Sequence, residues 1–147
     1  MSVKTQEKHM QRLAVLVKQD LKYNFGPKES GFNGAKKEYL QTGKTFFRAM
    51  AKDLGFTQSK VYAMSGGIGV GGDVVLMGMW SEGNGIYILL HENDFTGCFM
   101  YRSIRHMKDY TGGHNRHLTH GSLSWGYTAL LERFLELKEE NDLAKAA

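Results

Sequence analysis

The stretch DVVLMGMWSEGNGIYILL, residues 73–90, holds two apolar runs separated by a short polar segment. Both runs are rich in Val, Ile, Tyr and Trp, which favour strands, and each has the length of an ordinary strand. The polar segment contains Asn84-Gly85, a pair that favours the type I′ turn of a tight hairpin. The stretch therefore predicts two antiparallel strands joined by that turn.

Two further strands extend this hairpin. The alternation in KVYAM, residues 60–64, predicts a strand before it, and GCFMYRSIR, residues 97–105, predicts one after it. Between the first two strands lies GGIGVGGDV, residues 66–74, which contains a G-x-G-x-x-G pattern. A dinucleotide site needs a helix after this pattern, whereas a strand follows here. We therefore interpret the segment as a glycine-rich hairpin or bulge.

Apolar residues at helical spacing predict three helices, at residues 5–23, 35–54 and 123–140. Gly55 is expected to end the second helix, and Ser122 or Ser124 to cap the last one. The predicted order is ααββββα in a single domain spanning residues 1–147. The expected fold class is α+β, with an antiparallel meander of about four strands and three helices packed on one face.

The amino-acid composition indicates where the protein is located and what kind of partner it binds. The chain has one cysteine, which cannot form an internal disulfide, and this predicts a reducing, cytoplasmic location. The longest apolar run, residues 74–80, is far shorter than the roughly 20 residues of a membrane span, so no membrane partner is expected. The formal net charge is +4, and the basic residues are concentrated in residues 1–60 and 101–120. This distribution predicts an anionic partner.

Three groups of basic residues are candidates for binding that partner. Lys4, Lys8 and Arg12 form a row at i, i+4 spacing on the first predicted helix, and Lys44, Arg48 and Lys52 form a second row on the next. The third group begins in the last predicted strand and continues after it, with an aromatic residue among its cations. It consists of Arg102, Arg105, Lys108, Tyr110 and Arg116. Cations interleaved with aromatics suit phosphates and bases. We expect one continuous basic surface for nucleic acid or an acidic protein face; a solvated face is the simpler alternative.

Histidines in HMKDYTGGHNRHLTHGSL, residues 106–123, permit a second hypothesis. His114, His117 and His120 recur every third residue and could share a metal, while His106, Asp109 and His114 could form a catalytic acid–base group. The chain has no H-E-x-x-H and no C-x-x-C pattern. We therefore expect no metal, no cofactor and no enzymatic activity, and keep a small metal-dependent hydrolase or nuclease as the alternative.

The run from FFRAMAKDLGF to KDYTGGHN resembles small proteins encoded by phages, plasmids and integrative elements. The resemblance covers roughly residues 44–117, and Lys108–Asn115 is its most specific part. Such proteins include inhibitors of bacterial immunity, anti-CRISPR proteins among them, which are usually compact and non-enzymatic binders. Many of those are acidic mimics of nucleic acid, and the net charge of +4 departs from that pattern. The resemblance therefore implies a mobile-element inhibitor that grips an acidic protein surface or a nucleic acid, and it assigns no catalytic residue.

Overall fold

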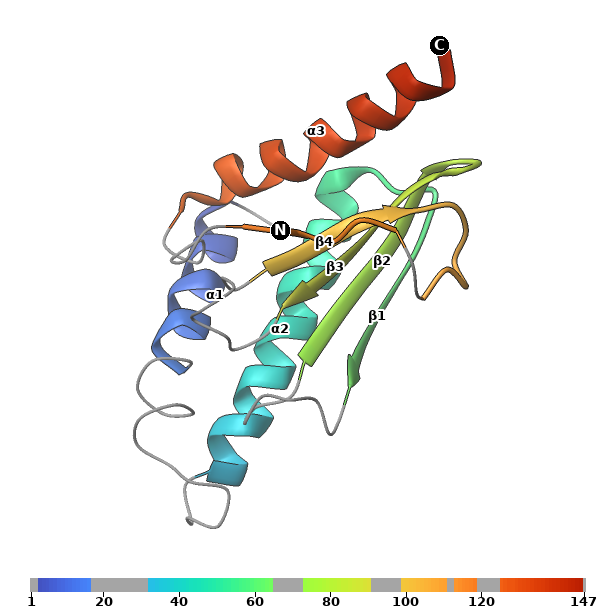
Figure 1. The fold of residues 1–147 in the computed structure, drawn as a ribbon. Coiled ribbons are helices and arrows are strands. Elements are labelled where there is room, and N and C mark those ends of the chain that lie inside the picture. The colour runs from blue at the N-terminus through green and yellow to red at the C-terminus, as the bar shows by residue number, and fades with distance from the viewer. Residues whose placement is uncertain are drawn as a thin grey trace.

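The fold is known from a computed structural model with three helices and five strands (Figure 1). The described residues are 3–16, 32–64, 73–90, 99–110, 113–118 and 125–146, without the side chains of 32–36 and 73. In chain order the elements are α1 (Val3–Val15), α2 (Phe32–Leu54), β1 (Gln58–Met64), β2 (Asp73–Ser81), β3 (Asn84–Leu90), β4 (Phe99–Ile104), β5 (Arg116–His117) and α3 (Tyr127–Ala146). The predicted glycine-rich hairpin lies outside these residues.

All five strands form one antiparallel sheet in the order β1-β2-β3-β4-β5. The fold is therefore α+β, and the predicted four-stranded meander is confirmed. β5 adds a fifth strand of two residues, which the sequence analysis missed because two residues show no alternation. Its pairing with β4 is extended by the Leu118 amide, which donates to the Phe99 carbonyl at 3.0 Å.

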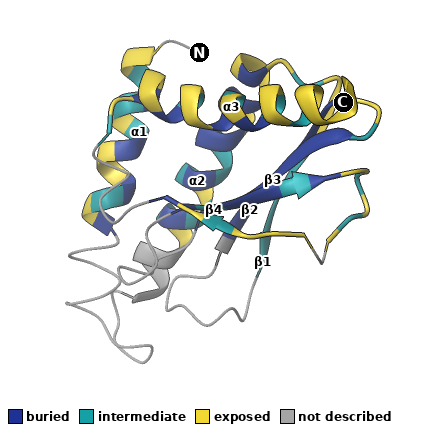
Figure 2. Cartoon of the chain, turned by 45° about the horizontal axis from the view of Figure 1, so that its top comes forward, coloured by how far each residue is buried: buried dark blue, intermediate teal, exposed yellow. Residues whose placement is uncertain are grey.

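Both faces of the sheet are apolar. One face carries Val74 and Leu76, and it packs in a single core with buried residues of all three helices, including Met10, Phe46 and Phe134. Figure 2 shows the helices with buried inner and exposed outer sides. The opposite face carries a second, smaller cluster built from Val75, Met77, Met79, Tyr87 and Ile104. The central strands are therefore buried on both sides, which explains their nearly continuous apolar runs.

The β2–β3 turn differs from the prediction. Ser81 pairs with Asn84, so the turn residues are Glu82 and Gly83, and Asn84-Gly85 begins β3. A type I′ turn needs positive φ at both central residues. Gly83 has a φ of 75°, whereas none of the described residues other than glycines has a positive φ. The type I′ prediction is therefore wrong.

The side chain of Asn84 forms hydrogen bonds with α3, and Asn84 is not one of the two central residues of the turn. Its side chain is fully buried, and its Nδ2 donates to the Lys138 carbonyl at 3.2 Å and to Asp142 Oδ1 at 2.9 Å. Asn141 Nδ2 donates back to Asn84 Oδ1 at 2.9 Å. A buried amide requires such partners, so these bonds fix the outer half of α3 against the start of β3.

The helix ends also depend on contacts between elements. α2 ends before Gly55, whose φ of 76° confirms the predicted C-terminal glycine. α3 begins at Tyr127 and runs to Ala146, later at both ends than predicted. Ser122 and Ser124 lie outside the described residues, as does the predicted helical stretch after Leu16. The amide of Tyr127 donates to Glu7 Oε1 of α1 at 3.3 Å. A carboxylate distant in sequence therefore accepts a hydrogen bond from an amide in the first turn of α3, which has no acceptor within the helix.

A close approach at Gly78 shapes the helix-facing side of β2. A Cβ built on Gly78 would lie 2.3 Å from Phe56 Cδ2, because the Phe56 ring lies directly over this glycine. The same ring packs on Trp80 with 5.2 Å between centroids. The glycine therefore makes room for the aromatic ring that follows α2.

Gly78→Ala is expected to lower the free energy of unfolding by about 1–3 kcal/mol, since overpacking forces neighbouring atoms to shift. The measurement is urea unfolding followed by tryptophan fluorescence. Gly126→Ala is the matched control, because its Cβ would meet Glu7 Oε1 at an ordinary 3.6 Å. Adding Phe56→Leu to Gly78→Ala should recover part of the loss, and the absence of any recovery would contradict this account.

Candidate anion-binding surfaces

The outer face of α2 is strongly basic. At 100° per residue, the cations among its described side chains point away from the buried Tyr39, Phe46 and Met50. These cations are Lys37, Lys44, Arg48 and Lys52. Lys44 is half-buried and the other three are exposed. We call these four residues the α2 row.

The two acidic residues of α2, Glu38 and Asp53, form hydrogen bonds with residues of other helices and not with the α2 row. Glu38 accepts two hydrogen bonds from Arg12 of α1, at 2.5 and 2.7 Å, and these hold the pKa of the Glu38 carboxyl below its usual value. Asp53 Oδ2 accepts a hydrogen bond from the Tyr127 hydroxyl at 2.6 Å. No ion pair joins the α2 row to any residue that the structure describes. The row therefore presents positive charge that no ion pair with a described residue neutralises.

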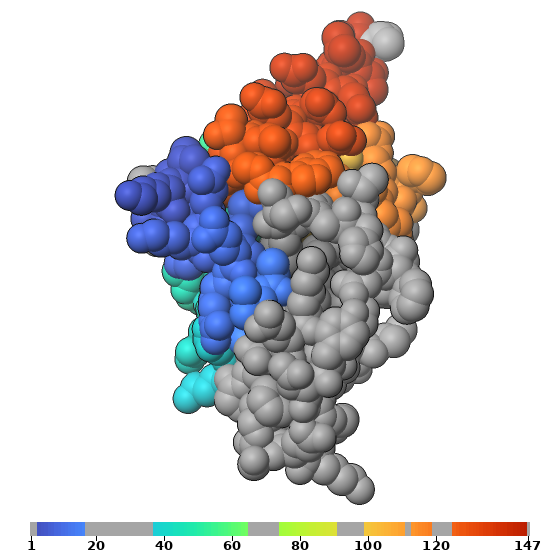
Figure 3. Space-filling model, turned by 90° about the vertical axis from the view of Figure 1, so that its left-hand side faces the viewer, coloured from blue at the N-terminus to red at the C-terminus, as the bar shows by residue number. Residues whose placement is uncertain are grey.

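α1 lies beside α2 and adds to this surface. Arg12 pairs with Glu38, and Gln6 Nε2 donates to the Phe46 carbonyl at 2.9 Å, so the two helices run antiparallel. This register carries the exposed Lys4 and Lys8 toward the level of the second half of α2. Figure 3 shows α1 at the surface beside the start of α3, with part of α2 beyond it.

A shallow depression of about 330 Å³ lies on the outer side of α2, lined by Thr45, Arg48, Ala49 and Lys52. Two of the four lining residues belong to the α2 row. The depression therefore gives an anionic group a place to lie between two cations.

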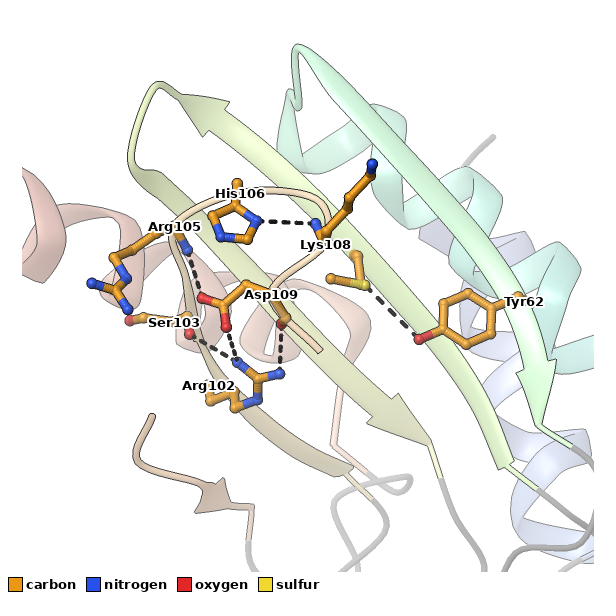
Figure 4. A network of polar contacts seen from close by, with 8 residues as sticks. Tyr62, Arg102, Ser103, Arg105, His106, Lys108 and Asp109 are labelled. Carbon is orange, nitrogen blue, oxygen red and sulfur yellow. Dashed lines mark hydrogen bonds and ion pairs between the residues drawn. The ribbon is translucent and has the colours of Figure 1, made fainter. Parts of the chain in front are cut away.

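Arg102, predicted to bind a partner, is buried instead. Its side chain is 3% exposed, and its guanidinium lies 4.7 Å above the Tyr87 ring. Nη2 donates to the Asp109 carbonyl at 2.7 Å, and Nη1 lies 3.7 Å from Asp109 Oδ1 (Figure 4). Arg102 therefore fastens the segment after β4 onto the second face of the sheet, and a phosphate cannot reach it in this structure.

Arg116 is also engaged within the protein. Its Nη2 lies 2.8 Å from Glu140 Oε2 of α3, and this hydrogen-bonded partner raises the pKa of the Arg116 guanidinium. Both side chains remain about half exposed, so the pair contributes little to stability. It joins β5 to α3 on the helix side of the sheet.

The remaining loop residues, Arg105, Lys108 and Tyr110, are exposed. In Figure 4, Lys108 points away from the Arg102–Asp109 contacts. The Tyr110 hydroxyl accepts a hydrogen bond from Lys60 of β1, whose Nζ lies 4.4 Å from the Tyr110 ring centroid and 5.9 Å from that of Tyr62. The sequence analysis missed Lys60 and Tyr62, although their alternate positions in KVYAM place both on one face of β1.

Tyr62 sits between apolar and aromatic neighbours. Its hydroxyl donates to Met77 Sδ at 3.9 Å. Burial and the neighbouring Tyr87 raise the pKa of Tyr62 to about 12. The hydroxyl therefore stays protonated at physiological pH.

The histidines are not assembled with Asp109. His106 Nδ1 accepts a hydrogen bond from the Lys108 amide at 3.2 Å, while Asp109 Oδ2 accepts one from the Arg105 amide at 3.0 Å. His114 and His117 are exposed, and His120 lies outside the described residues. Within the described ranges, no three His, Cys, Asp or Glu side chains group as a metal site would require.

The sheet separates the two sets of cations that were expected to form one surface. The α2 row lies on the helix side, whereas Met107 packs with the cluster on the opposite face, so the segment 105–110 covers that face. The predicted continuous basic surface is therefore divided in two.

No protein-family model, curated protein or solved structure matches the chain. None of the helices in the described ranges combines the length and the apolar character needed to cross a membrane.

Arg102→Ala is expected to lower the free energy of unfolding by about 2–4 kcal/mol, because it removes a buried guanidinium and leaves the Asp109 acceptors without their donor. Arg105→Ala is the matched control. It removes the same side chain from an exposed position and should change stability by less than about 0.5 kcal/mol. Urea unfolding measures both, and equal losses would contradict the anchoring role of Arg102.

Elemental analysis of untagged protein is expected to find well below one zinc or manganese ion per chain, because His106, Asp109 and His114 lack a shared geometry in the structure. Near one ion per chain, lost in His114→Ala, would instead support the metal-dependent hydrolase. Arg105→Ala serves as the control for nonspecific loss of metal.

Proposed function

We propose that this protein is a non-enzymatic binding protein that holds an anionic partner, either nucleic acid or an acidic protein surface, on the outer face of α2. The observation that carries the proposal is that no residue of the α2 row forms an ion pair with any described residue. Like charges at i, i+4 destabilise a helix by a few tenths of a kcal/mol per pair. An anionic partner would remove this cost.

The dimensions of the row favour an extended polyanion over a small anion. A helix rises 1.5 Å per residue, so Lys44, Arg48 and Lys52 follow one another at intervals of about 6 Å. From Lys37 to Lys52 the row extends over about 22 Å. Such a line of cations can neutralise several phosphates or carboxylates at once, and each neutralised phosphate releases a condensed counterion.

The biological setting that we propose is a mobile genetic element, with the protein acting as an inhibitor of bacterial immunity of the anti-CRISPR type. The resemblance of residues 44–117 supports this setting. The basic outer face of α2 supports a target that is itself acidic or carries nucleic acid. A protein of this kind would act by occupying its target, so the proposal requires no catalytic group.

Replacing Lys44, Arg48 and Lys52 together with Gln tests the binding surface. Affinity for a fluorescein-labelled DNA duplex, measured by anisotropy from 50 to 300 mM salt, is expected to fall for the variant. The slope of log affinity against log salt should also lose about 2–3 units, because each phosphate contact contributes roughly 0.7–0.9. The same titration against labelled polyglutamate tests the acidic-protein form of the proposal.

The matched control replaces Arg133, Lys138 and Lys145 of α3 with Gln, which removes the same charge from another surface. This control should keep most of the wild-type slope. Equal losses in both triple variants would show that net charge alone drives binding. An unchanged slope in the α2 variant, against both probes, would contradict the proposal.

A further inference from the structure

The second face of the sheet carries an aromatic and cationic patch that the α2 row does not explain. It consists of Lys60 and Tyr62 on β1 together with Lys108 and Tyr110 on the segment after β4. We call these four residues the tyrosine patch. Contacts of Lys60 with the hydroxyl and ring of Tyr110 and with the ring of Tyr62 bring the two segments together.

Tyr110 is unusual in its exposure. Among the described residues, the exposed large hydrophobic side chains are Val3, Val15, Tyr110 and Leu143, and Tyr110 alone is aromatic. The segment that carries Tyr110 has regular backbone hydrogen bonds of its own. The Tyr110 amide donates to the Lys108 carbonyl at 3.0 Å, and the Asp109 amide donates to the His106 carbonyl at 3.1 Å. The ring is therefore presented by a short folded turn.

The charges around the ring favour an anion. Lys108, two residues before Tyr110, is exposed, and Lys60 is half-buried with its Nζ 4.4 Å from the ring centroid. Asp109 is the acidic residue of the same segment. Its carboxylate accepts a hydrogen bond from the Arg105 amide and lies 3.7 Å from Arg102 Nη1. The segment thus holds its acidic group inward and its cations outward, which leaves positive charge around an exposed aromatic ring.

We propose that the tyrosine patch binds single-stranded nucleic acid, with an unpaired base stacked on Tyr110 and the adjoining phosphates held by Lys60 and Lys108. An aromatic ring flanked by cations matches the two parts of a nucleotide, because the base stacks and the phosphate pairs with the cations. A duplex keeps its bases stacked inside the helix and offers this ring nothing to stack on. An acidic peptide would use the cations and leave the ring unused.

Partly buried apolar side chains continue the patch along the sheet. Met64, Leu89 and Met100 are half-buried and pack with the cluster on this face. They extend the surface on which further bases could lie, and sheet faces with exposed aromatics bind single strands in this manner. The inference goes beyond the proposed function, since the sheet lies between the tyrosine patch and the α2 row.

The test compares Tyr110→Ala with Tyr110→Phe on two labelled strands of 12 nucleotides, one of thymidines and one with abasic sites in place of the bases. Tyr110→Ala is expected to weaken binding of the thymidine strand about five- to hundredfold, the effect of losing one stacked base. Tyr110→Phe keeps the ring and should stay within about twofold of wild type. On the abasic strand, all three proteins should bind with equal affinity.

Because Tyr110 is exposed and its contacts with Lys60 lie at the surface, Tyr110→Ala should melt within about 4 °C of wild type, measured on the same samples by circular dichroism. Lys60→Gln should lower the salt slope on both strands by about 0.7, since the slope reports phosphates and not bases. The proposal is overturned if Tyr110→Ala binds the thymidine strand like wild type, if wild type prefers the abasic strand or ignores both, or if the loss is equal on both strands. The triple α2 variant should keep the Tyr110 effect, so either proposal can fail alone.

Discussion

Burial of the central strands on both faces is the constraint from which the rest of the structure follows. Val74 and Leu76 turn toward the helices, while Val75 and Met77 turn the other way, and all four are fully buried. Three helices cover the first face. The second face has no helix among the described elements, and the segment after β4 crosses it (Figures 1 and 4). Arg102 holds this segment on the second face through its contacts with the carbonyl and the carboxylate of Asp109.

This arrangement also explains why the basic residues divide into two surfaces. A segment that must cover the second face brings its cations to that side, while the cations of α2 are confined to the opposite side by the helix that carries them. In sequence the two groups look equivalent. In space they are separated by a sheet, so a ligand of one surface need not contact the other.

Much of the fold could be predicted from local patterns. Alternation located the four longer strands, and helical periodicity located the helices within a few residues. The errors involve partners far away in the chain. Asn84 looked like a turn residue because its hydrogen-bond partners in α3 are more than 50 positions away, and the start of α3 depends on Glu7 of α1.

The candidate site was harder to predict for the same reason. Arg102 alternates with Tyr101 along β4, so the pattern could place it on the second face, but charge suggested that this face was open to solvent. Its burial depends on Asp109 and Tyr87, which only the folded chain brings near. Lys60 and Tyr62 were overlooked because they lie far before the basic loop in the sequence, and only the folded sheet brings Lys60 into contact with Tyr110.

The contacts of α3 divide the helix into two halves with different local stability. Its buried side chains are Tyr127, Leu130, Phe134 and Leu137, so none of them lies in the last nine residues of the helix. Beyond them the helix is attached by polar contacts, in which Asn141 and Asp142 bond Asn84, Asn141 accepts from Ser103, and Lys145 donates to the Glu82 carbonyl.

Hydrogen bonds of this kind exchange for water with a small net change in free energy, whereas the apolar first half cannot separate without exposing the core. The last turns of α3 can therefore open as a local unit while the domain stays folded. Backbone amides near the C-terminal end of the helix would then exchange with solvent through fraying, and those around Phe134 only through global unfolding.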